Sequence, residues 1–161
     1  MGMAEEKLKK MGLDFVGRKK KLASSCALKS GEGLLFVGAV LPKKADGTLC
    51  VTGKYGAPLT EEDMTLAAKY AAKQLLMQIC DGAGGLDNVA SILAVNVLVN
   101  CAPGQDDRLD AFADVISQAL VDALGKRGEH TRTVLGMCTL EQNAPICCDA
   151  MVALRGGSDR V

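Results

Sequence analysis

Three apolar runs leave little choice of fold, because the sequence offers only two long helices to cover them. The runs begin at Leu34, Ile92 and Val134, and none of them alternates polar with apolar residues. A strand with one face in water alternates, whereas a strand that is buried on both faces reads as a continuous apolar run. The three runs therefore predict strands that need cover on both faces of a sheet.

Both helices are predicted by apolar residues at helical spacing. The first begins after Thr60, whose hydroxyl is a typical N-cap, and continues through an acidic first turn until Gly82 closes it. The second runs from about Asp107 to Leu124, and Gly125 ends it. Each helix is long enough to cross one face of a sheet.

The element order β-β-α-β-α-β-β predicts an α+β fold with a mixed sheet. Strands are expected at 22–28, 34–41 and 89–99, and as a hairpin of two strands within 128–154. Each helix joins strands that can lie parallel through a right-handed crossover, so both helices pack on one face. The second face is left for a partner, most simply further copies of this chain in a closed ring. The alternative is one more helix than the pattern reveals.

Length and charge bound the class of protein. The chain has 161 residues, the size of one domain, with nineteen basic and nineteen acidic residues. A neutral chain has no overall field to attract nucleic acid or a membrane surface. We expect a basic leader with a short helix at 1–21, a single domain at 22–154 and a tail at 155–161.

The leader carries seven basic and three acidic residues, a net charge of +4. It is interpreted as a solvated amphipathic segment, with an arm for nucleic acid as the alternative. No signal-peptide core follows it, and the longest apolar run, 89–99, is too short to span a bilayer. A soluble, cytoplasmic protein is expected.

The seven cysteines are expected to be free thiols, because nothing in the sequence indicates export. With one histidine and no C-x-x-C pair, the ligand spacing of a zinc site is missing, so we expect no zinc site. Cys147 and Cys148 are neighbours in a predicted strand, so their side chains should point to opposite faces.

Arg132 is a permanent charge at the start of an otherwise apolar segment. A guanidinium presents a rigid fork that binds a carboxylate through two parallel hydrogen bonds. Next to a sheet face that a neighbouring subunit covers, Arg132 would form an anion pocket at the interface. The alternative is an ion pair with an acid such as Glu129 or Asp149.

Other reactive or polar side chains give less specific signals. His130 is a candidate general base and Cys147 a candidate nucleophile, although a lone histidine and a buried strand thiol are more often structural. Asn100 and Asp114 are interpreted as caps of turns, and Tyr55 as a ring packed beneath a turn.

Several stretches, in a specific order and spacing, carry a resemblance that covers about residues 4 to 154. They are Gly31 to Val37, Leu41-Pro42, Thr52 to Gly56 followed by Leu59 to Glu62, Val97 to Gly104, and Gly128 to Val134. In these stretches the chain resembles the Rid (reactive intermediate deaminase) family, also called YjgF-like, in its longer bacterial-type branch.

The resemblance implies a chorismate-mutase-like α+β fold assembled as a homotrimer, with clefts between the subunits. It also implies hydrolysis of reactive enamines and 2-imino acids, such as 2-aminoacrylate, to 2-keto acids and ammonia without metal or cofactor. Arg132 matches the arginine that holds the substrate carboxylate in the family. The backbone amide that assists this arginine falls on Val134.

The sequence departs from the family at the catalytic glutamate, whose position is Cys147. A thiol is a poor substitute for a carboxylate acceptor at neutral pH. The family's Ser-Gly-Gln reads Gly38-Ala39-Val40 here, and its cleft tyrosine falls near Ser24 or Ser25. The candidate catalytic residues are Arg132, Cys147, Asp149 and Glu141, the last two as stand-ins for the glutamate; the candidate binding residues are Arg132, Val134, Ala39, Gly38, Asn100 and Tyr55.

Three functions follow from these features. The first is an enamine/imine deaminase that acts at an inter-subunit cleft. The second is a trimer that binds a small carboxylate without turnover. The third, an endoribonuclease or translation inhibitor, is a label that the family also carries, and zero net charge with few stacking aromatic side chains argues against it.

Overall fold

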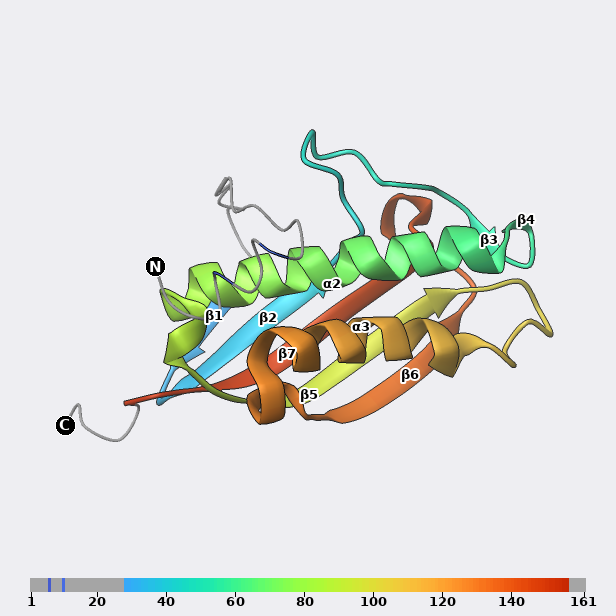
Figure 1. The fold of residues 1–161 in the computed structure, drawn as a ribbon. Coiled ribbons are helices and arrows are strands. Elements are labelled where there is room, and N and C mark those ends of the chain that lie inside the picture. The colour runs from blue at the N-terminus through green and yellow to red at the C-terminus, as the bar shows by residue number, and fades with distance from the viewer. Residues whose placement is uncertain (1–5, 7–9, 11–27, 157–161) are drawn as a thin grey trace.

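In the part of the chain that the structure describes, a five-stranded sheet carries two α-helices against one of its faces (Figure 1). The computed structural model describes residues 28–156 together with Glu6 and Lys10. The rest of the predicted leader at 1–21 and nearly all of the strand predicted at 22–28 lie outside the described residues, as do Ser24 and Ser25.

The sheet has the order β1-β2-β7-β5-β6 and is mixed, as predicted. β5 and β6 are parallel neighbours, and the other neighbouring pairs are antiparallel. A small parallel pair, β3 with β4, comes just before the first long helix. The strands are β1 (Leu28–Gly31), β2 (Leu34–Val40), β3 (Lys54–Tyr55), β4 (Pro58–Leu59), β5 (Val89–Asn100), β6 (Thr131–Met137) and β7 (Ile146–Leu154).

The hairpin predicted within 128–154 is wrong. Both of its strands exist, but β5 lies between them, so that Val97 pairs with Val134 on one side and with Cys148 on the other. The crossover through a helix returns the chain parallel to β5. The connection from β6 to β7 contains the short helix η3 (Glu141–Asn143) and passes the end of β5. There the backbone N–H of Asn100 donates to the Pro145 carbonyl oxygen over 2.9 Å.

The helices begin and end close to where their caps predict. α2 (Glu61–Ala83) starts with a capping box, in which Thr60 and Asp63 exchange backbone-to-side-chain hydrogen bonds of 3.0 and 3.3 Å. It ends at Gly84, two residues beyond the predicted Gly82, because Gly84 adopts the left-handed conformation and donates to the Cys80 carbonyl. α3 (Leu109–Leu124) begins two residues later than predicted and ends at Gly125, as predicted. The short helices η1 (Leu86–Asn88) and η2 (Gly125–Gly128) follow α2 and α3.

Both helices cover the same face of the sheet, as the crossovers predict (Figure 1). Alternate residues such as Val95 and Val97 of β5 are buried in the core beneath them. The opposite face, here called the open face, carries large apolar side chains in contact with solvent. They are Phe36 (43% exposed), Leu93 (39%), Leu135 (52%) and Met151 (37%). The apolar runs therefore alternate between buried and exposed positions within one chain, and no helix of residues 28–156 covers the second face.

Across residues 28–156, neither α-helix combines the length and apolar character that a membrane span requires. In the same range, no three His, Cys, Asp or Glu side chains lie close enough together to hold a metal ion.

Candidate functional site

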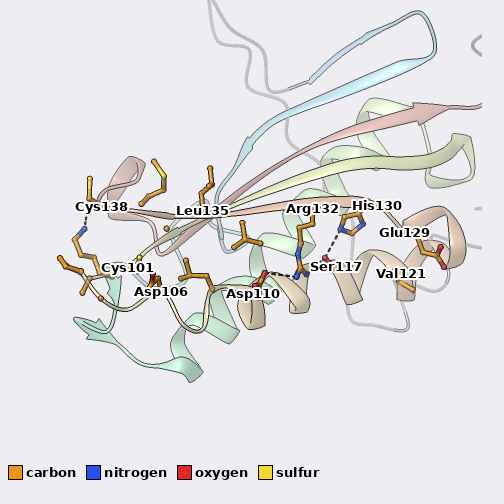
Figure 2. Close-up of a pocket in the computed structure, with 18 residues that line it drawn as sticks. Cys101, Asp106, Asp110, Ser117, Val121, Glu129, His130, Arg132, Leu135 and Cys138 are labelled. Carbon is orange, nitrogen blue, oxygen red and sulfur yellow. Dashed lines mark hydrogen bonds and ion pairs between the residues drawn. The ribbon is translucent and has the colours of Figure 1, made fainter.

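A groove of about 1250 Å³ runs along β6, between this strand, α3 and the loop that follows β5 (Figure 2). β6 is the last strand of the sheet, so its outer edge has no strand partner among residues 28–156. The residues that line the groove come from all three of these segments, with Lys54 at one end. They include Cys101, Asp106, Leu109, Asp110, Ser117, Val121, Glu129, His130, Arg132, Val134, Leu135, Met137 and Cys138.

Arg132 points from β6 towards α3, with about a fifth of its side chain exposed. Its guanidinium donates to Asp114 Oδ1 over 2.7 Å and to Ser117 Oγ over 3.1 Å, and it lies 3.4 Å from Asp110 Oδ1. The three partners share one face of α3 because they are four and three residues apart. The ion-pair partners are thus Asp110 and Asp114, and not the Glu129 or Asp149 that the sequence offered, because only α3 faces Arg132.

The two carboxylates that hold Arg132 are themselves open to water. Asp110 is 83% exposed and Asp114 is 70% exposed. An ion pair between groups of this exposure contributes at most about 1 kcal/mol, since water screens it. A ligand carboxylate that enters the groove can therefore replace Asp110 and Asp114 as the partner of the guanidinium at a small cost in free energy.

His130 continues the polar chain on the far side of Arg132. Its Nε2 lies 3.0 Å from Ser117 Oγ, and its Nδ1 lies 2.6 Å from the Gly128 carbonyl oxygen. Both ring nitrogens therefore have partners, and the imidazole is held between α3 and the end of η2. Figure 2 shows His130, Ser117, Arg132 and Asp110 along one wall of the groove.

Lys54 closes the other end of the groove. Its Nζ donates to Asn100 Oδ1 over 3.0 Å and to the Cys138 carbonyl oxygen. Asn100 is fully buried, and its amide nitrogen lies 3.3 Å from the Gly53 carbonyl and 3.1 Å from the Ala144 carbonyl. Asn100 therefore joins the loops that surround the end of β5 and lies behind Lys54, away from the groove wall.

Tyr55 is buried in the core and does not line the groove. Its ring packs edge-on against Phe112, with 4.9 Å between the ring centres and 75° between their planes. The interpretation of Tyr55 as a packed ring is confirmed.

Cys147 and Cys148 face opposite sides of the sheet, as predicted. Cys148 is in the core beneath the helices, whereas Cys147 packs with Leu41 and Ala144 in a separate apolar cluster. Burial, with a smaller contribution from the Asp149 carboxylate, raises the pKa of Cys147 to about 11. Burial also raises the pKa of Cys148. Both side chains are therefore neutral thiols at physiological pH.

The other predicted site residues lie away from the groove. Asp149 accepts from Asn96 over 2.8 Å and lines a smaller hollow of about 230 Å³ with Gly38, between β2, β5 and β7. Ala39 is exposed beside it, in the irregular stretch of β2, and Glu141 is exposed in η3. Within one chain, the structure brings Arg132 and Val134 together and keeps Cys147, Asp149 and Glu141 out of the groove.

Asp110, Ser117 and Lys54 were not identified from the sequence, and Asp114 was interpreted only as a cap. One signal was present: Asp110, Asp114 and Ser117 recur at helical spacing on the face of α3 that carries no apolar stripe. Such a polar line is typical of any exposed helix face. Only the position of Arg132 opposite this face turns it into part of a site.

Solved structures share this fold over most of their length. The protein Atu1372 of unknown function from Agrobacterium tumefaciens is 26% identical, with a TM-score of 0.82, and the match covers 94% of this chain and 93% of that one. A Shewanella oneidensis protein described as a candidate endoribonuclease is 19% identical, with a TM-score of 0.86 and coverage of 95% and 100%. RidA from an Antarctic Psychrobacter is 13% identical, with a TM-score of 0.56 and coverage of 84% and 92%. The chain therefore has the fold of the YjgF/RidA-like proteins.

One relative is more similar in sequence than the three solved structures above. Protein TCP17 of Trypanosoma cruzi is 33% identical over 121 residues, which is 74% of each of the two chains. No protein-family model matches the sequence. At this identity and coverage, the chain belongs to the same family as Protein TCP17.

Proposed function

We propose that the protein is a homotrimer that hydrolyses small 2-imino acids to 2-keto acids and ammonia in clefts between its subunits. The observation that carries the proposal is Arg132, a guanidinium in an open groove whose protein partners are exposed carboxylates. The YjgF/RidA-like fold agrees with it. The substrate carboxylate replaces Asp110 and Asp114 on the guanidinium, with the Val134 amide as a second donor on the same edge strand.

The open face supports the trimer. Phe36, Leu93, Leu135 and Met151 expose apolar surface that water covers at a cost of roughly 25 cal/mol per Å². Leu135 belongs both to this face and to the lining of the groove. A sister chain placed over the open face therefore also forms one wall of the groove.

The water that attacks the imine needs an acceptor, and Cys147 is a poor one with its pKa near 11. In the proposed trimer this acceptor is Asp149 or Glu141 of a neighbouring chain, since neither residue lines the groove of its own chain. Otherwise the solvent itself supplies the water.

A second candidate function is favoured by this same neutral thiol. A trimer that keeps the Arg132 clamp but has no carboxylate at position 147 binds a small carboxylate and releases it unchanged. Binding without turnover then replaces hydrolysis.

The test is the hydrolysis of iminopyruvate that is generated in situ. We expect the wild-type protein to accelerate the reaction and Arg132→Ala to lower the rate by roughly a hundredfold or more, since an anion clamp acts on the transition state. Arg108→Ala is the matched control, because Arg108 forms an exposed ion pair of 2.8 Å with Glu61 and does not line the groove.

Two results decide between the candidates. If the wild-type protein does not accelerate hydrolysis but binds pyruvate in a manner that Arg132→Ala abolishes, the binding function holds. If Arg132→Ala keeps full activity, the anion clamp itself is wrong.

A further inference from the structure

Three side chains on one wall of the groove form a hydrogen-bonded chain (Figure 2), which continues to the backbone carbonyl of Gly128 behind them. The Arg132 guanidinium lies 3.1 Å from Ser117 Oγ, which lies 3.0 Å from His130 Nε2. His130 Nδ1 lies 2.6 Å from the Gly128 carbonyl oxygen. Imine hydrolysis by the Arg132 clamp makes no use of the serine and histidine in this chain.

The direction of each hydrogen bond follows from its two end groups. A carbonyl oxygen only accepts, so His130 Nδ1 carries the ring proton and donates to Gly128. In the neutral form of the ring, this tautomer presents a lone pair at Nε2. A guanidinium only donates, so Ser117 Oγ accepts from Arg132 and its single proton points to Nε2. This polarity is the one that a hydroxyl nucleophile and its general base require.

The carbonyl that orients His130 cannot shift easily. Gly128 packs so closely on α3 that a Cβ atom there would lie 2.3 Å from the Leu120 carbonyl oxygen. Ser117 stands on the same helix, one turn before Leu120. The nucleophile and the group that orients its base are therefore fixed to one rigid element, while both Ser117 and His130 remain partly exposed in the groove.

We propose that Ser117 and His130 are a nucleophile and base, and that they give the groove an acyl-transfer activity towards short-chain esters or thioesters. The groove that holds Ser117 is also lined by the apolar Val121 and Val134, which suits a short aliphatic acyl group. The guanidinium of Arg132 is the donor nearest to the reacting carbonyl oxygen. This activity is separate from imine hydrolysis and does not rest on it.

The reaction balances with water as the only co-reactant. Ser117 Oγ attacks the acyl carbon while its proton passes to His130 Nε2, and the carbonyl electron pair moves to the oxygen near Arg132. Collapse breaks the bond to the leaving alcohol or thiol, which takes the proton from His130. Water then loses a proton to Nε2 and attacks the acyl-serine, which releases the acid and restores the serine hydroxyl.

The first test uses the wild-type protein with an alkyl fluorophosphonate, which transfers its phosphoryl group to an activated serine and releases fluoride. Intact mass should rise by one adduct, and peptide mass spectrometry should locate this adduct at Ser117. An unmodified protein, or an adduct at any other residue, overturns the proposal. This measurement needs no variant to fold.

The second test is hydrolysis of p-nitrophenyl butyrate. Ser117→Ala and His130→Asn should each lower the rate by about a hundredfold or more, whereas Ser91→Ala, a serine on β5 outside the groove, should retain it. If Ser117→Ala keeps the wild-type rate, the serine is not the nucleophile and the chain of hydrogen bonds only ties β6 to α3. Iminopyruvate hydrolysis measured on the same Ser117→Ala protein separates this outcome from a failure of the imine proposal.

Discussion

The edge strand β6 contributes residues to both the groove and the open face, but the surroundings of these residues differ. On the groove side, Arg132 meets two carboxylates, a serine and, through the serine, a histidine, and every one of these groups has a partner within the chain. On the open face, Leu135 and the apolar residues of the neighbouring strands stay partly exposed in the described part of the chain. A polar site can be complete in one chain because hydrogen bonds satisfy it locally, whereas an exposed apolar face is satisfied only by another surface.

The largest expected effect is on assembly. Phe36→Glu places a charge on the open face and should convert a trimer to single chains, since a buried, unpaired carboxylate costs several kcal/mol in each interface. Leu66→Glu is the matched control, because Leu66 is also 43% exposed but lies on α2. Light scattering gives the number of chains per particle. A wild-type monomer would remove the difference between the two surfaces.

Two thiols near the same end of β5, Cys138 and Cys147, should also differ in reactivity. At pH 8 the pKa near 11 leaves Cys147 about a hundredfold less ionised than a thiol at the ordinary value of 9.0. Iodoacetamide should therefore modify the exposed Cys138 first, and the rate at Cys147 should rise as the pH approaches 11. Peptide mass spectrometry measures both rates, and rapid modification of Cys147 at pH 8 would contradict its burial.

The raised pKa of Cys147 should also make the stability of the folded chain depend on pH. The unfolded chain releases the Cys147 proton near pH 9.0, whereas the folded chain retains it to about pH 11. The free energy of unfolding should therefore fall as the pH rises between these two values. The slope should be reduced in Cys147→Ala.

Two asparagines of β5 compare a fully buried amide, Asn100, with an exposed one, Asn96. Asn100→Ala removes a buried amide that bridges Gly53 and Ala144 and should lower the free energy of unfolding by about 2 kcal/mol or more. Asn96→Ala, which is exposed and bonds only to Asp149, should change it by less than about 0.5 kcal/mol. Urea unfolding measures both. Equal effects would mean that Asn100 does not hold the loops together.

The smallest expected effect is on the affinity of Arg132 for a small carboxylate. Asp114→Asn removes the nearer carboxylate on Arg132 and should tighten the binding of pyruvate by a few-fold, with less than about 1 kcal/mol of change in stability. Asp122→Asn, on the same helix but bonded to Gln118, should leave binding unchanged. Calorimetry measures both affinities. Weaker binding in Asp114→Asn would show that Asp114 positions the guanidinium instead of competing for it.

The positions of the helices along the chain were more predictable than which strands lie next to one another in the sheet. Thr60 and Gly125 mark helix ends through bonds within a few residues, so the sequence alone locates α2 and α3 to within two residues. The hairpin failed because strand pairing is decided by where a crossover returns the chain. The same reason hid the partners of Arg132, which are 15 to 22 residues away along the chain.

What the sequence by itself determined is local or compositional: two capped helices, apolar strands too numerous for two helices to cover, and one permanent cation in an apolar segment. The tertiary structure alone decided that this cation faces α3, that Ser117 joins it to His130, and that Cys147 is enclosed by Leu41 and Ala144. The physical reason is the distance along the chain over which each kind of interaction acts. Caps and periodicity act over one helical turn, whereas a site at a sheet edge depends on which segments the sheet order brings side by side.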